Sequence, residues 1–145
     1  MPAVASTQRT VKIDGSELTA EIDGALESVL VVDRPAMPDM CTLTFRDPAR
    51  DIRGKAGLEA GKKVEGATGS LRDDAPEVLI DGEVTSVEAD YDTLGSRAIV
   101  RGYDRSHRMT AGRKTATFQE MSYSEIAKKI AGNNGLTADC DDSGG

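Results

Sequence analysis

Carboxylate side chains are dense in one stretch of the chain, between residues 73 and 92. Two carboxylates held close together can perform acid–base catalysis, and clustered carboxylates can bind calcium. The spacing does not match the Asp-x-Asp-x-Asp-Gly pattern of a calcium loop. The stretch therefore predicts a solvated strand face with charged loops, and a hydrolase that uses a pair of these acids stays an alternative. The acids are Asp73, Asp74, Glu77, Asp81, Glu83, Glu88, Asp90 and Asp92.

Nucleophilic and metal chemistry have few candidate residues. The chain has one histidine, His107, and two cysteines, Cys41 and Cys140, that lie far apart in the sequence. It contains no Gly-x-Ser-x-Gly, Cys-x-x-Cys or phosphate-binding loop motif. Cys41 lies in an apolar run, where a buried reduced thiol is expected. We therefore predict no catalytic residue, no metal site, no cofactor and no enzymatic activity.

Cationic side chains gather between residues 101 and 114, where Asp104 is the only acid. In a chain of formal net charge −7, this basic cluster is a local reversal of charge. It could bind phosphate, or it could lie in an ordinary solvated loop. It could also pair with the acidic surface of a neighbouring subunit. We take the last use as our prediction. The members are Arg101, Arg105, His107, Arg108, Arg113 and Lys114.

The composition narrows the classes of function. The chain has 145 residues, with 18 Lys and Arg against 25 Asp and Glu. This acidic balance disfavours sequence-independent nucleic-acid binding and attachment to membranes through basic residues. The longest apolar run, Val29–Val32, is far too short to span a bilayer, and residues 1–9 lack the apolar stretch of a signal peptide. We therefore expect no nucleic-acid specificity, no membrane insertion and no signal peptide.

Strand patterns dominate the first two-thirds of the chain and would position these residues. A long hairpin is the clearest, because residues 77–91 and 97–103 alternate on either side of a turn at 92–96. Gly82 interrupts the alternation, which predicts a bulge or a barrel bend. In the first arm, one face is predicted to carry Val84, Ser86 and Glu88, and the other Thr85, Val87, Ala89 and Tyr91.

Shorter strands are predicted before the hairpin. Residues 10–13 and 16–22 flank Asp14-Gly15, a dipeptide that favours a tight turn. Residues 28–33 form an apolar, β-branched run that is typical of a strand buried on both faces or in a barrel wall. Residues 40–47 alternate, and their predicted inner face carries Cys41, Leu43 and Phe45.

Residues 49–76 have a weaker pattern, with isolated apolar residues among glycines and charges. They predict a turn entering a short strand at 58–64 and an exposed loop at 71–76. After the hairpin, residues 104–109 predict a short helix capped by Asp104, and residues 114–118 predict a short strand.

One helix is predicted near the end of the chain, over residues 122–131. Ser122 and Glu125 have the spacing of a capping box, and Asn133-Asn134-Gly135 is a helix stop. The residues that follow are expected to fray. The whole chain is thus predicted to be mainly β, with an antiparallel β-barrel over residues 1–112 and a small strand–helix appendage over residues 113–145.

Three pieces of sequence follow one another along this predicted order of strands and helix. They are residues 80–85 (Ile-Asp-Gly-Glu-Val-Thr) in the first arm of the hairpin, residues 103–109 (Tyr-Asp-Arg-Ser-His-Arg-Met), and residues 115–131, followed by Asn134-Gly135-Leu136. Together they resemble the N-terminal part of the phage late control D / VgrG family. These are the baseplate hub proteins of contractile tails, type VI secretion spikes and extracellular contractile injection systems.

The resemblance implies a hub built like a tail tube. Such hubs are trimers in which two β-barrels per chain form a pseudo-hexameric ring that joins the tail tube to the spike. The implied partners are copies of the chain itself, the tail-tube protein, the spike and other baseplate proteins. The implied location is the bacterial cytoplasm during assembly and then the contractile particle or phage tail. Family members are longer than this chain, so we expect it to cover one barrel and the start of the next module.

A free-standing β-barrel module that binds protein or carbohydrate is the alternative function. Sugar-binding platforms usually need exposed aromatic rings, and aromatic residues make up only 3% of this chain. The composition therefore favours the hub.

Overall fold

The computed structural model describes residues 7–70 and 76–144. The chain divides into two compact units, Met1–Asp104 and Arg105–Gly145. The sequence pattern placed the division later, after residue 112, and that the units are separate domains stays a prediction. Most of the predicted loop at 71–76, with Asp73 and Asp74, lies outside the described residues.

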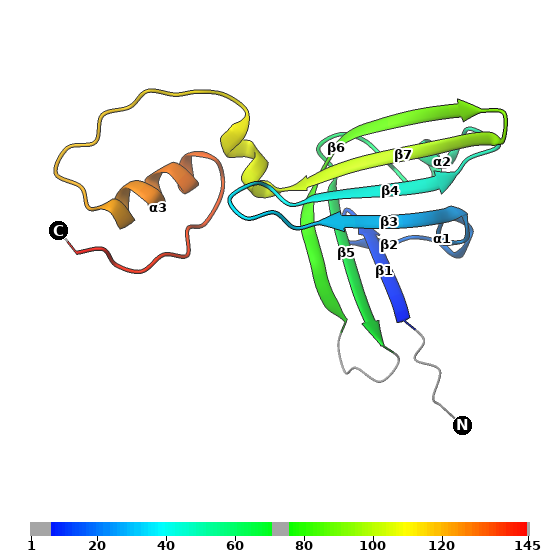
Figure 1. Cartoon of the computed structure of the whole chain (residues 1–145), viewed down its shortest axis with the longest axis horizontal. Helices are drawn as coiled ribbons and strands as arrows, with labels where there is room; N and C mark the ends of the chain where they lie inside the picture. The colour runs from blue at the N-terminus through cyan, green and yellow to red at the C-terminus, as the bar shows by residue number, and fades with distance from the viewer. Residues whose placement is uncertain (1–6, 71–75, 145) are drawn as a thin grey trace. The chain divides into compact units, whose positions relative to one another are not determined.

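The first unit is built on one sheet of seven strands, in which neighbouring strands are antiparallel. The strand order is β2-β1-β5-β6-β7-β4-β3, with β6 as a long bent strand (Figure 1). The predicted mainly antiparallel β fold is confirmed. Among the described residues the sheet ends at β2 and β3, so it is open rather than a closed barrel. The strands are β1 Thr7–Ile13, β2 Ser16–Glu17, β3 Leu26–Val32, β4 Met40–Arg46, β5 Lys63–Ser70, β6 Glu77–Asp92 and β7 Gly95–Asp104.

Side-chain hydrogen bonds join β1 to the start of β3, where no strand ladder does. The guanidinium of Arg9, in β1, donates to the backbone carbonyls of Asp23 and Leu26, each at 3.2 Å. Buried or partly buried carbonyls need a donor, and here a long side chain supplies it in place of a neighbouring strand.

The core lies against the inward face of the sheet. In β4 the predicted alternation is confirmed, because Cys41, Leu43 and Phe45 are all buried and Phe45 has 0% of its surface exposed. Two short helices, α1 (Ala20–Ala25) and α2 (Ile52–Lys55), add Ile22 and Ile52 to the core. The other buried members are Val11, Ile13, Leu26, Leu58, Val64, Ile80, Val84, Ala98 and Val100.

The long hairpin is confirmed as β6 and β7, but bulges change which side chains face the core. Leu79 and Thr85 are extra residues in β6 with no residue opposite them on the neighbouring strand. The Thr85 hydroxyl donates to the Arg101 carbonyl at 3.2 Å. Because of this bulge, Val87 packs against the core on the same side as Val84, and the predicted opposite faces for these two valines are wrong.

Gly82 itself lies in a continuous stretch of the ladder, paired with Val64 and Asp104. A Cβ atom at this position would lie 2.2 Å from the Tyr103 carbonyl oxygen. The glycine is therefore required by the close approach of the β7 backbone, and the bulges lie to either side of it.

The turn at Asp14 and Gly15 is confirmed, with φ of 50° and 80°. The predicted returning strand over residues 16–22 is wrong beyond the two residues of β2. The Thr19 hydroxyl accepts a hydrogen bond from the Ile22 amide at 3.4 Å and caps α1. Because the short helix buries Ile22, the apolar spacing that suggested a strand is satisfied by a helical turn instead.

Two strands differ from their sequence patterns. The run at 28–33 is an edge strand rather than one buried on both faces, since Leu30 is 54% exposed. The turn entering a short strand that was predicted at 58–64 is present, but the strand, β5, is longer than predicted and continues through a glycine-rich stretch to Ser70. A Cβ at Gly66 would lie 3.2 Å from Cγ2 of Ile80, so the small residue makes room for the core side chain of β6.

The second unit contains the 3₁₀ helix η1 (Arg105–Thr110), where a short helix was predicted, and the helix α3 (Tyr123–Asn133). The predicted capping box at Ser122 and Glu125 is present. Gly135 has φ of 69°, and the Leu136 amide donates to the Ala131 carbonyl at 2.9 Å. The helix therefore ends in a Schellman motif at the predicted stop.

Two other expectations for this unit fail. Residues 114–118 form no strand. The residues after α3 were expected to fray, but they are hydrogen-bonded to the first turn of the helix. The Ser124 amide donates to the Ser143 hydroxyl at 3.0 Å, and the Ser124 hydroxyl donates to Asp142 at 3.2 Å. In the part of the chain that the structure describes, no helix has the length and apolar character needed to cross a membrane.

Candidate functional site

The structure divides the basic cluster between the two units. Arg101 lies in β7 and forms an ion pair with Glu88 of β6. Its charge is paired within the sheet, and the other five members of the cluster belong to the second unit. These are Arg105, His107 and Arg108 in η1, and Arg113 and Lys114 in the irregular segment that follows.

Part of the cluster lines a groove in the second unit, with a volume of about 660 Å³. The guanidinium of Arg108 donates to the Asn134 carbonyl at the end of α3, at 3.3 Å. Arg113 and Lys114 are exposed on the groove wall. No carboxylate is among the described residues that line the groove, so its lining is basic and apolar. The apolar lining consists of Met109, Ala111, Ala116, Phe118 and Ile130.

Several acids of the stretch form ion pairs with basic side chains, among them Asp81, Glu88 and Asp92. Asp81 lies 3.4 Å from the Lys63 ammonium, and Asp92 lies 3.1 Å from the Arg97 guanidinium. Pairs of this kind neutralise charge between neighbouring strands of a solvated sheet face. The absence of enzymatic activity stays a prediction.

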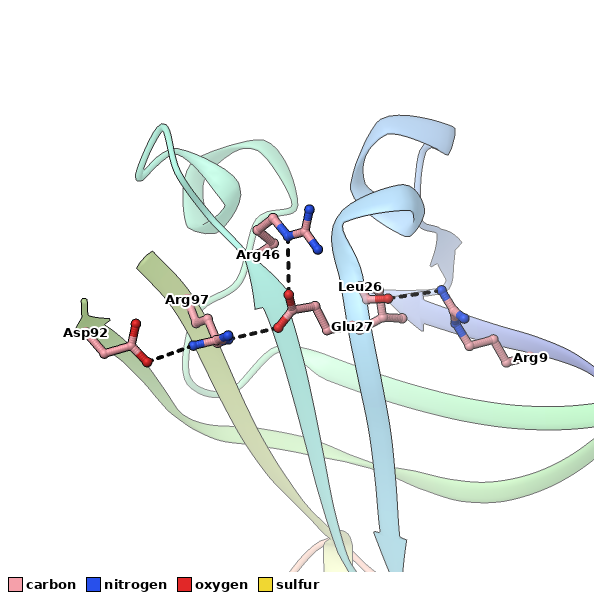
Figure 2. Close-up of polar contacts among 6 residues, drawn as sticks. All are labelled: Arg9, Leu26, Glu27, Arg46, Asp92 and Arg97. Carbon is pink, nitrogen blue, oxygen red and sulfur yellow. Dashed lines mark hydrogen bonds and ion pairs between the residues drawn. The ribbon is translucent and has the colours of Figure 1, made fainter. Parts of the chain in front are cut away.

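A chain of charges crosses four strands at one end of the sheet (Figure 2). Glu27 accepts from Arg46 Nε at 3.2 Å through one carboxylate oxygen and from Arg97 Nε at 2.9 Å through the other. Arg97 also pairs with Asp92. Glu27 is an extra residue in β3, between the paired positions Leu26 and Ser28. The bulge therefore lies at the end of the strand, where the four charges connect neighbouring strands.

These charges make stability depend on pH. Hydrogen bonds from Arg97 and Arg46 hold the pKa of Glu27 below its ordinary value of 4.5, and the Leu94 amide is the main cause that lowers the pKa of Asp92. A lowered pKa stabilises the fold above the unfolded-state pKa, and the contribution is lost as the pH falls through the folded-state value.

We expect Glu27→Gln to melt below the wild type at pH 7, because it removes the carboxylate that both arginines share. The difference in Tm should shrink as the pH falls through 4.5 and below, where the wild-type carboxylate also becomes neutral. Thermal melts followed by circular dichroism at several pH values measure this. Glu17→Gln, which changes an exposed glutamate outside the network, serves as the control, and an equal pH dependence in both variants would contradict the prediction.

Among the described residues of the first unit, one acidic residue is buried, Asp47. Its Oδ1 accepts from the backbone amides of Asp51 at 2.9 Å and Ile52 at 3.3 Å, at the start of α2. Its own amide donates to the Ser96 carbonyl at 2.8 Å. Asp47 therefore fixes the entry to α2, and this contact explains its burial.

Asp47→Ala should lower the free energy of unfolding by about 1–3 kcal/mol, because the amides of Asp51 and Ile52 lose their acceptor. Asp47→Asn keeps an acceptor oxygen and should recover most of the loss. Urea unfolding of the two variants measures the difference. Equal stabilities of the alanine and asparagine variants would show that the carboxylate oxygen does not matter.

The other residues considered for chemistry are two cysteines and one histidine. Burial raises the pKa of the Cys41 thiol, which keeps it protonated and unreactive at neutral pH. His107 lies half-buried in η1, and Cys140 is exposed near the end of the chain. Within the described ranges, no group of three or more His, Cys, Asp or Glu side chains could hold a metal ion.

The comparison with solved structures bears on the fold. The chain is similar to the 43 kDa tail protein of prophage MuSo2 from Shewanella oneidensis, with a TM-score of 0.62 and 19% identity over 90% of this chain and 38% of that one. It is also similar to a tail protein from Neisseria meningitidis MC58, with a TM-score of 0.60 and 15% identity over 88% of this chain and 34% of that one. The chain has the fold of part of these tail proteins.

The chain thus spans little more than a third of the length of the two tail proteins. No protein-family model matches the sequence, and no curated protein matches it. The likeness lies in the backbone arrangement, at a level of identity where surface side chains need not correspond.

Two features of the surface were missed by the sequence patterns. The charge chain through Glu27 depends on a bulge and on strand order, and its members are distant in sequence. The groove depends on how the segment around Arg113 lies against the end of α3. The only sequence signal for the groove was the basic cluster itself, which contributes Arg108, Arg113 and Lys114 to its wall.

Proposed function

We propose that this chain is a structural component of a phage tail or of a bacterial contractile injection apparatus. The observation that carries the proposal is the similarity of fold to two tail proteins over 90% and 88% of the chain. A tail component needs rigid β-walls and charged faces for its neighbours. The antiparallel sheet, with ion pairs across its surface, is of this kind.

Within the tail, we propose the role of a baseplate hub or spike adaptor that joins the tail tube to the spike. The resemblance of residues 80–136 to the late control D / VgrG hubs supports this finer role. The partners are then other copies of the chain, as a trimer in the particle, together with the tail-tube and spike proteins. The chain is made in the bacterial cytoplasm and is incorporated into the particle there. The basic cluster of the second unit is the proposed contact surface for a neighbouring subunit of the particle.

Native mass and partner binding test the proposal. Light scattering behind size exclusion, over a range of concentrations, should give a mass that rises toward a trimer. Purified tail-tube and spike proteins of the same particle should bind the chain. A monomer at every concentration that also fails to bind both partners would contradict the structural role.

The alternative of a carbohydrate-binding module finds little support in the surface. Among the described residues, the exposed tyrosines are Tyr91 and Tyr123, and they belong to different units. Each unit therefore has one strongly exposed tyrosine rather than a platform of several. Tyr91 is moreover engaged by the Arg50 guanidinium, which lies 4.8 Å from its ring centroid. Binding on a glycan array would restore this alternative.

A further inference from the structure

The segment over residues 112–119 has a strand-like sequence and no strand partner. It contains Thr115, Thr117 and Phe118, which favour β structure, and it forms neither helix nor strand. Among the described residues, none of its backbone groups takes part in a hydrogen bond. The segment is exposed, so water can satisfy its amides and carbonyls, and an added strand can take the place of that water.

The same segment forms one wall of the groove, and its side chains give the groove a definite chemistry. Arg113 and Lys114 are exposed and make no ion pair within the described chain. The Lys129 ammonium lies 5.7 Å from the Phe118 ring centroid, which adds a third positive charge beside an apolar surface. Ile130 of α3 also lines the groove and is 39% exposed.

We propose that residues 113–118 accept an extended strand from a partner protein, and that this strand alternates carboxylate and apolar side chains. Its backbone pairs with the free amides and carbonyls of the segment. Because successive side chains of a strand lie on opposite faces, its carboxylates lie on the face of Arg113, and its apolar side chains lie on the face of Phe118, beside Ile130 and the aliphatic part of Lys114. The inference rests on the proposed assembly role only in taking the partner to be another protein of the same particle.

A second copy of this chain is a poorer occupant, although its end is acidic. Asp142 and Ser143 are already hydrogen-bonded to Ser124 in the first turn of α3. The groove, in contrast, is lined by residues from the other end of that helix, Ile130, Asn133 and Asn134. To fill a neighbour's groove, the acidic end would have to give up its own contacts.

The first test uses a fluorescent eight-residue peptide that alternates glutamate and valine, with a lysine–valine peptide as its counterpart. Fluorescence anisotropy with the full chain should show binding of the glutamate peptide that weakens with added salt, and at least tenfold weaker binding of the lysine peptide. The double variant Arg113→Glu, Lys114→Glu should weaken glutamate-peptide binding at least tenfold. The matched variant Arg34→Glu, Arg53→Glu makes the same change of charge outside the groove and should bind as the wild type does.

A second pair of variants separates strand pairing from charge attraction. Ala116→Pro and Thr117→Pro each remove one amide without changing the charge, and adjacent amides of a strand point in opposite directions. One of the two should therefore lower the affinity at least tenfold. Unchanged affinity in both would overturn strand pairing, and equal binding of the two peptides would overturn the acidic partner.

The oligomeric state decides between the occupants. If light scattering shows self-association that the Arg113→Glu, Lys114→Glu variant abolishes, the groove holds a second copy and the proposed partner is wrong. If the peptide fails to bind while the chain still binds tail-tube or spike protein, the groove proposal fails and the tail function stands. If the chain binds the peptide but stays monomeric and binds neither tail-tube nor spike protein, the groove proposal stands and the tail function fails.

Discussion

Replacing Phe45 by alanine is expected to lower the free energy of unfolding by about 3–5 kcal/mol. The ring has no exposed surface and stands opposite Leu26 of β3 and Ala98 of β7, both of them buried. Backbone pairing on both sides holds these neighbours in place, so they cannot collapse into the space that the ring leaves. A typical domain is stable by roughly 5–15 kcal/mol, so a loss of this size is a large share of the total and brings the first unit close to unfolding.

Urea unfolding followed by circular dichroism measures the loss, and Phe45→Leu should retain part of the stability if the alanine variant does not fold. The control is Leu94→Ala, at the tip of the long hairpin, where the side chain is 85% exposed. That change should alter stability by less than about 0.5 kcal/mol. A Phe45→Ala variant as stable as Leu94→Ala would mean that the core is not centred on β4.

Gly82→Ala is expected to cost about 3 kcal/mol, the upper end of what an overpacked site usually costs. The added Cβ would lie 2.2 Å from the carbonyl oxygen and 2.7 Å from the carbonyl carbon of Tyr103. These are backbone atoms of β7, which is paired on both sides within the sheet, so relief requires that β6 and β7 move apart. The variant should also lose protection from hydrogen exchange first at the amides of these two strands.

Gly24→Ala provides the matched control. Gly24 lies in α1, and a Cβ there would have no atom within 4 Å. Because alanine favours the helical conformation, this variant should be as stable as the wild type or more stable by up to about 1 kcal/mol. If both glycine variants behave alike in thermal melts, the close approach of β7 to Gly82 is not a feature of the folded protein.

The success of the local predictions has a common physical origin. The turn at Asp14-Gly15, the alternation of β4 and the capping box of α3 each depend on contacts among residues close in sequence. Positive φ at a turn, one buried face of a strand and a side-chain acceptor at a helix start are all determined within a few residues. Such features remain the same in any tertiary arrangement that keeps the element.

The failures arose where a neighbour far along the chain decides the outcome. The run at 28–33 has the composition of a buried strand, yet the strand order places it at an edge. The bulge at Thr85 moved Val87 to the core side, and this follows from the register against β7 rather than from the pattern of β6. The strand predicted at 114–118 has the right side chains but lacks a partner, and a strand cannot exist without one.

The candidate surfaces divide in the same way. The sequence by itself determined a mainly antiparallel β chain with one capped helix near its end, an acidic surface and a local basic cluster, because these follow from residue type and short-range spacing. Only the tertiary structure decided that Arg101 forms an ion pair with Glu88 and that Glu27 forms ion pairs with two arginines from other strands. It also decided that Arg113 and Lys114 line the same groove as Ile130. The physical reason is that a charge is neutralised, or left available, by whatever lies within a few ångströms of it, and in a folded sheet those neighbours come from strands that are distant in sequence.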